Sequence, residues 1–182
     1  MGTHVSIISS VTWLTAFIFA GIVWISRCYI NWEAVCPTPI VSLSDGGRER
    51  VYIAPDAVDF VSLAPNGFTS YYNSTGFDWK RLAGAEVLQI ESMDPYDYVD
   101  LVADTVTGNY LDHGVRVNSV FTSYRLLGSS FSQRFGDLAS RQFSPIQSLT
   151  FELVPVGATQ PENVTVPFLH VFMGNSFSDK DS

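Results

Sequence analysis

The aspartates have the spacing that comes nearest to a chemical pattern in this chain. Asp97, Asp100 and Asp104 follow one another at i, i+3 and i+7, so a helix would place them on one face, with Asp94 just before them. Clustered carboxylates can hold Ca²⁺, which takes about six to eight oxygen ligands. Carboxylates of a single helix rarely converge on one ion, however, and a solvated helix face explains the same spacing. We therefore predict no metal site.

Sequence motifs for catalysis are missing. The chain has no G-x-S-x-G, H-E-x-x-H or C-x-x-C motif and no phosphate-binding glycine loop, and its three histidines lie far apart. A serine–histidine–aspartate triad depends on tertiary geometry, so no serine can be singled out. We predict no cofactor and no catalytic residue, which favours a chain without catalytic activity of its own.

Four arginines follow the aspartates at wide intervals: Arg116, Arg125, Arg134 and Arg141. They could pair with the acidic helix face, or bind the carboxylate of a partner through the two-pronged edge of the guanidinium. Because exposed ion pairs contribute little, we interpret them as ordinary surface arginines. The formal net charge of −8, with only two lysines, excludes a nucleic-acid partner, which needs a basic face.

The N-terminal region is apolar. Residues 5–25 form an uncharged run of 21 positions, long enough to cross the roughly 30 Å core of a bilayer as a helix. After a tail of residues 1–4, we expect a transmembrane signal-anchor helix over residues 5–26, with the lipid bilayer as partner. A cleaved signal peptide and a buried core helix are the alternatives.

Two cysteines and two glycosylation patterns bear on topology. Cys28 and Cys36 could close a small disulfide loop in an oxidising compartment, and Cys28 could instead be palmitoylated on a cytoplasmic side. Arg27 after the apolar run favours a cytoplasmic body, whereas the acceptors Asn73 and Asn163 matter only in a secretory lumen. We expect a single-pass membrane protein with an extracytoplasmic body, lumenal or at the cell surface.

Beyond the apolar run, the sequence predicts one domain. Residues 27–49, with their Pro, Ser and Gly, suggest a stalk, residues 50–174 the body, and residues 175–182 a polar tail. Asp94 before Pro95 begins a predicted helix over residues 95–107, with Gly108 at its end. We expect strands at residues 50–54, 58–63, 86–90, 114–127, 148–154 and 164–173, and a loop at 68–76. The fold class is therefore α+β, mainly β with one clear helix.

One stretch resembles a known family. The segment Leu82-Ala83-Gly84-Ala85-Glu86-Val87-Leu88-Gln89-Ile90, followed by Asp94-Pro95 and the helix, resembles the core of a PDZ-like domain. The order of later segments is similar to the N-terminal, non-catalytic region of tail-specific serine peptidases, in the branch similar to the chlamydial protease-like factor. The resemblance covers roughly residues 50–172. It implies a peptide groove near Leu82, Gly84, Val87, Tyr98, Leu101, Val102 and Thr105, although an apolar helical stripe of this kind is more often core.

Three functions remain open from the sequence. The first is a membrane-anchored, non-catalytic interaction module that binds a protein or an extended peptide, which adds as a strand to a sheet edge. The second is part of a tail-specific serine protease whose catalytic domain is absent from these residues. The third is a single-span accessory or structural subunit of a large membrane assembly or virion.

Overall fold

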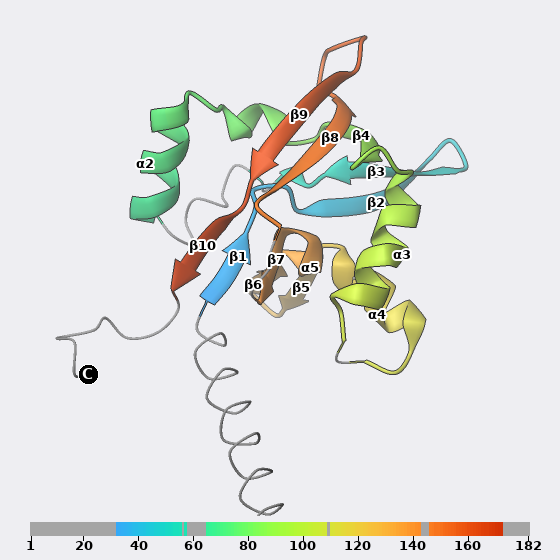
Figure 1. Cartoon of the computed structure of the whole chain (residues 1–182). Helices are drawn as coiled ribbons and strands as arrows, with labels where there is room; N and C mark the ends of the chain where they lie inside the picture. Colours follow the sequence, from blue (N-terminus) through green and yellow to red (C-terminus); the bar gives the residue numbers. More distant parts are fainter. Residues whose placement is uncertain (1–31, 56, 58–64, 109, 143–145, 173–182) are drawn as a thin grey trace, which may run out of the picture.

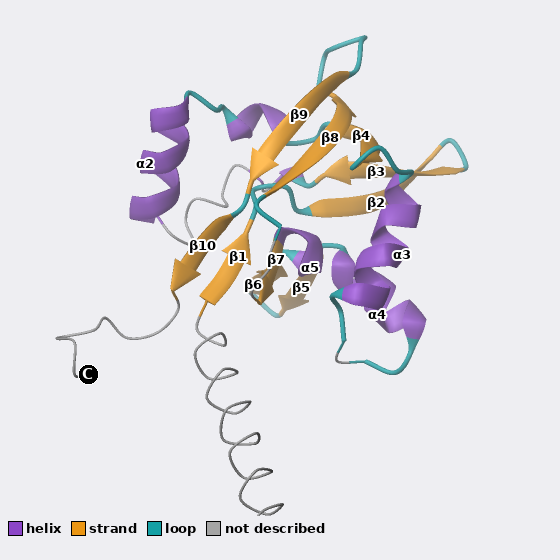
Figure 2. Ribbon diagram, in the orientation of Figure 1, coloured by secondary structure: helices purple, strands orange, loops and turns teal. Residues whose placement is uncertain are grey.

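A computed structural model describes residues 32–55, 57, 65–108, 110–142 and 146–172, and the structural statements below refer to these residues. The described chain is mainly β with few helices (Figures 1 and 2). The helices are α2 (Pro65–Thr75), η2 (Trp79–Leu82, a 3-10 turn), α3 (Pro95–Thr105), α4 (His113–Val120) and α5 (Gly136–Ala139). The strands are β1 (Trp32–Val35), β2 (Ile40–Asp45), β3 (Arg48–Ile53), β4 (Glu86–Ile90), β5 (Ser123–Leu127), β6 (Ser130–Arg134), β7 (Ser140–Gln142), β8 (Ser148–Val154), β9 (Glu162–Pro167) and β10 (Leu169–Phe172).

The strands form three antiparallel sheets. The largest has the order β2-β3-β4-β8-β9, so β2 and β9 are its edges. A second sheet has the order β10-β1-β7, and β5 and β6 form a separate hairpin. Figure 1 shows α2 and the α3–α4 pair on opposite sides of the molecule, with the sheets between them.

The main core lies between the five-stranded sheet and α3. Side chains along β8 alternate between buried and partly buried, the period-two pattern of a strand with one face on a core. Its inward side chains are Leu149, Phe151 and Leu153, all fully buried. The same cluster takes in Val51, Ile53, Val87, Ile90, Tyr98, Val99, Val102, Val164 and Val166.

Helix α3 confirms the predicted start. The carboxylate of Asp94 accepts a hydrogen bond from the backbone N–H of Tyr96 at 2.9 Å, and Pro95 occupies the first turn. The helix ends at Thr105, two residues earlier than predicted. Tyr98, Val99 and Val102 face the core, whereas Leu101 is 44% exposed. Of the apolar stripe expected at Tyr98, Leu101, Val102 and Thr105, only Tyr98 and Val102 therefore face the core, and Val99 is buried in place of Leu101.

The expected fold class needs a correction at its N-terminal element. No helix in the part of the chain that the structure describes is both long enough and apolar enough to cross a membrane. Helices α2 and α3 have 11 residues each, about 16 Å at roughly 1.5 Å per residue, against a bilayer core of about 30 Å. A fold that begins with a transmembrane helix is thus not supported, and residues 5–26, on which this prediction rested, lie outside the described residues.

Other expectations also fail. The structure has several helices instead of one: residues 68–76, expected as a loop, belong largely to α2, and the first half of the expected strand 114–127 is α4. Helix α4 begins because the side chain of Asp112 accepts a hydrogen bond from the N–H of Val115. Within the expected stalk, β1 and β2 are strands of the body, and Ile40 is fully buried. The expected strand over residues 58–63 lies outside the described residues.

Candidate functional site

Strand β2 presents an open edge of the main sheet. It pairs with β3 on one side, and on the other side the N–H of Thr122 donates to the carbonyl of Ile40 at 2.8 Å. Because both backbone groups of one residue in an antiparallel strand point to the same side, and this side alternates along the strand, Ser42 and Ser44 present their N–H and C=O outward. Among the described residues, no further backbone hydrogen bond outside the β2–β3 pair involves Val41 to Asp45.

A groove of about 510 Å³ runs along this edge. One wall is β2 itself, and the other is the end of α4 with the start of β5. Leu43 is 53% exposed and Tyr124 46% exposed, so large apolar surface faces solvent on both walls. The lining residues are Val41, Ser42, Leu43, Asn118, Phe121, Thr122, Ser123 and Tyr124, among which there is no carboxylate and no cationic side chain. This groove suits an uncharged, extended ligand.

Two contacts hold the walls of the groove in place. The hydroxyls of Ser42 and Tyr96 lie 2.8 Å apart and connect β2 to the first turn of α3. The hydroxyl of Thr122, which is buried, donates to the carbonyl of Arg134 at 2.7 Å and ties the second wall to the end of β6. Each wall of the groove is therefore connected by a hydrogen bond to a neighbouring element of the fold.

The residues predicted for a peptide groove do not line one surface. Leu82, Val87, Tyr98 and Val102 are buried in the main core, while Leu101 and Thr105 lie on the solvent side of α3. Gly84 has a φ of +79°, and a Cβ built there would lie 3.0 Å from Cγ2 of Val156. The structure does not bring these seven residues together at the β2 groove.

Sequence reasoning missed β2 because its residues fell within the expected stalk. A signal was present: Val41 to Ser44 alternates apolar and polar side chains, and Gly46-Gly47 follows before a second strand-like run. Both glycines have positive φ, which a tight hairpin turn requires. The pattern predicts a β-hairpin, and the abundance of Pro and Ser nearby concealed it.

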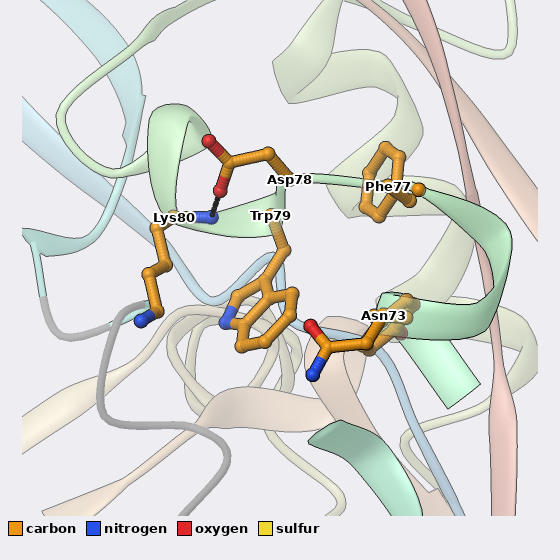
Figure 3. Close-up of a pocket in the computed structure, with 7 residues that line it drawn as sticks. Asn73, Phe77, Asp78, Trp79 and Lys80 are labelled. Carbon is orange, nitrogen blue, oxygen red and sulfur yellow. Dashed lines mark hydrogen bonds between the residues drawn. The ribbon is translucent and has the colours of Figure 1, made fainter. Parts of the chain in front are cut away.

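An aromatic pocket lies at the other side of the molecule. Tyr72, Phe77 and Trp79 form a cluster that packs α2 and η2 against β1, and Figure 3 shows the Trp79 indole between the Lys80 side chain and the Asn73 amide. The Lys80 ammonium lies 5.7 Å from the centre of the indole ring. Because the wall of this pocket is the cluster that anchors α2, we assign it a structural role.

The acidic face of α3 pairs with α4. Asp104 accepts a hydrogen bond from Arg116 at 3.0 Å and lies 3.2 Å from Nδ1 of His113, and Asp100 lies 3.4 Å from the same ring. No group of three or more potential ligands that could hold a metal ion occurs among the described residues. The carboxylates thus connect two helices at the surface, and Arg116 is an ion-pair partner of the acidic face instead of an isolated surface arginine.

The glycosylation and disulfide predictions are only partly covered by the described residues. Asn73 on α2 and Asn163 on β9 are both exposed, as acceptors must be. Cys36 is fully buried, and its sulfur lies 3.1 Å from the hydroxyl of Thr38. Cys28 lies outside the described residues, so its pairing with Cys36 stays a prediction.

Burial should make the Cys36 thiol unreactive. Desolvation raises the pKa of Cys36 from 9.0 to about 12, so at pH 8 its thiolate fraction should be roughly a thousandfold lower than in an unfolded chain. In a Cys28→Ser background we therefore expect iodoacetamide to label Cys36 about a thousandfold more slowly in the native chain than in urea, as measured by mass spectrometry. Folding favours the protonated thiol, so its contribution to stability is complete below about pH 9 and is lost as the pH rises towards 12. Equal labelling rates in the two states would contradict the burial.

Comparisons with protein-family models, with curated proteins and with solved structures found no match to this chain. Any function must therefore follow from the structure itself.

Proposed function

We propose that this chain is a non-catalytic interaction module that binds an extended peptide as an additional strand beside β2. The observation that carries the proposal is the outward-facing backbone of Ser42 and Ser44 next to an uncharged groove. An unpaired sheet edge is a template for another strand, and this one is flanked by a second wall that can select side chains.

The binding mode follows from the geometry of a strand. Ser42 and Ser44 each offer one donor and one acceptor, so a peptide can form two pairs of ladder hydrogen bonds with β2. Alternate side chains of the peptide would then enter the groove and contact Leu43, Phe121 and Tyr124. Main-chain bonds supply affinity in this mode, and apolar pockets supply selectivity. We therefore expect peptides with apolar residues at every second position.

The opposite edge of the sheet is less suited to a partner. The outer strand β9 carries Asn163, which is exposed and is a predicted glycosylation acceptor, and its Glu162 pairs with Arg81 of η2. The resemblance to the non-catalytic region of tail-specific peptidases supports strand addition as the mode. The groove differs from the expected one, because its second wall is the α4–β5 connection and not α3. The expected membrane contact lies outside the described residues and plays no part in the proposal.

Substituting Ser44 by proline tests the proposal. Proline removes the outward N–H and places a ring where a peptide backbone would lie, yet an edge strand tolerates it because no internal ladder bond is lost. Peptides that bind the full chain are first selected from a phage-displayed library of random 12-residue sequences. We expect Ser44→Pro to lower the affinity for the tightest-binding of these peptides by at least about tenfold in calorimetric titration, the equivalent of roughly 1.4 kcal/mol.

Ser44→Ala is the matched control, since it keeps the backbone N–H, and it should bind the peptide with unchanged affinity. Both variants should keep the unfolding midpoint of the parent chain within a few degrees. Equal peptide affinity of Ser44→Pro and the parent would refute binding at β2. A concentration-dependent dimer, seen by light scattering and lost in Ser44→Pro, would instead show that a second copy of the chain occupies the edge.

A further inference from the structure

Arg141 is a buried cation in the middle of β7. It is only 6% exposed, contrary to the interpretation as a surface arginine. Its guanidinium lies 4.7 Å from the centre of the Phe168 ring. No ion pair between Arg141 and an Asp or Glu occurs among the residues that the structure describes. A buried charge of this kind is costly unless an opposite charge compensates it.

The hydrogen-bonding pattern of Arg141 leaves one edge free. Tyr98 forms a side-chain hydrogen bond with the guanidinium, but Nε and Nη2 are buried and have no partner within the described part of the chain. These two nitrogens carry parallel N–H groups on one edge of the guanidinium, the arrangement that binds both oxygens of a carboxylate. Desolvation lowers the pKa of Arg141, yet a guanidinium stays protonated in proteins. The free edge is thus a pair of donors that an incoming acceptor can satisfy.

A cavity of about 410 Å³ adjoins Arg141. Its lining includes two carboxylates, but each already has a donor: Asp137 accepts hydrogen bonds from Thr107 and Arg134, and Glu33 accepts one from Ser140. The four charged side chains around the cavity therefore sum to zero, which disfavours a ligand with several negative charges. Val106 and Tyr110 add apolar and aromatic surface.

We propose that this cavity binds a small monocarboxylate with an apolar or aromatic tail. Its two oxygens accept hydrogen bonds from Nε and Nη2 of Arg141, and its tail packs beside Val106 and Tyr110. Both nitrogens are buried, so entry of the ligand requires the guanidinium to turn towards the cavity. The volume falls in the usual range for small-molecule sites, about 300–1,000 Å³. This site is separate from the peptide groove and does not depend on it.

Titration of the full chain with sodium benzoate tests the proposal, with acetate and inorganic phosphate as comparison ligands at constant ionic strength. We expect saturable benzoate binding and a downfield shift of the Arg141 Nε–H signal in proton–nitrogen correlation spectra. Phosphate should produce neither effect. Acetate should bind more weakly than benzoate, because it lacks the ring.

Arg141→Lys keeps the charge but removes the two-pronged edge, so benzoate affinity should fall roughly tenfold to a hundredfold. The matched control is Arg125→Lys on the exposed strand β5, which should bind benzoate like the parent chain. Three results would each overturn the proposal: benzoate binding that does not saturate, an unshifted Arg141 signal, or phosphate binding as tight as that of benzoate. The Arg141 signal is read in the parent chain, so the test remains decisive even if Arg141→Lys does not fold.

Discussion

Gly136→Ala is expected to destabilise the chain by roughly 4 kcal/mol or more. Single substitutions cause losses of this size only through severe defects such as a backbone clash. Gly136 has a φ of +77°, and a Cβ built there would lie 2.3 Å from the carbonyl oxygen of Val120 and 2.5 Å from that of Phe121. Both neighbours are backbone atoms, so neither can move aside by changing a rotamer. Urea denaturation followed by circular dichroism would measure the change in the free energy of unfolding.

Gly128→Ala provides the matched control for this prediction. Gly128 has a similar φ of +59°, but no atom of the described residues lies within 4 Å of the position that a Cβ would take there. Only the left-handed conformation is then penalised, at about 1–2 kcal/mol. If the two substitutions cost the same, the close approach at Gly136 would be disproved. Because Val120 and Phe121 lead into the wall of the β2 groove, Gly136→Ala should also abolish peptide binding, whereas Gly128→Ala should not.

The second large effect is expected for Tyr72→Ala, at about 3–5 kcal/mol. The Tyr72 side chain is fully buried, with ring centres 5.2 Å from Trp79 and 5.5 Å from Phe77, and its hydroxyl donates to the carbonyl of Pro167 at 3.1 Å. Burial raises the pKa of Tyr72, so the hydroxyl keeps its proton and remains a donor. Removing the ring leaves a cavity and detaches α2 from β1 and β9. Thermal unfolding of the variant should show a clearly lower midpoint.

Two further variants separate the contributions at this position. Tyr71→Ala changes the neighbouring residue, which is 39% exposed, and should cost well under half as much. Tyr72→Phe keeps the ring but leaves the Pro167 carbonyl without this donor, at a cost of about 1 kcal/mol. A larger loss for Tyr71→Ala than for Tyr72→Ala would mean that α2 packs with a different face.

Local signals in the sequence were sufficient for some elements. Asp94-Pro95 predicted the start of α3, because a capping carboxylate and a proline without an N–H satisfy the same helix terminus. The strands β4 and β8 were predicted from short apolar runs, and their bounds agree with the structure. In contrast, α2 was predicted as a loop because its small polar residues have low helix propensity. The packing of Tyr72 in a buried cluster stabilises the helix instead.

The candidate sites could not be predicted to the same degree. Nothing local distinguishes Arg141 from Arg125, yet one is buried against Phe168 and the other lies on an exposed hairpin. Likewise, the pairing of the strands decides which of them ends a sheet, and β2 is an edge because β3 is its one neighbour in the order β2-β3-β4-β8-β9 of the described strands. Pairing of this kind joins residues far apart in the chain, whereas sequence patterns report only neighbours.

Composition and local pattern by themselves determined an acidic, mainly β chain with a capped helix at Pro95 and no recognisable catalytic motif. Only the tertiary structure decided which polar groups of the described residues have no hydrogen-bond partner: the outward backbone of Ser42 and Ser44, and Nε and Nη2 of Arg141. The physical reason is that hydrogen-bond satisfaction is settled across the whole fold. A donor or acceptor is left open for a partner only where no distant segment of the same chain has paired with it.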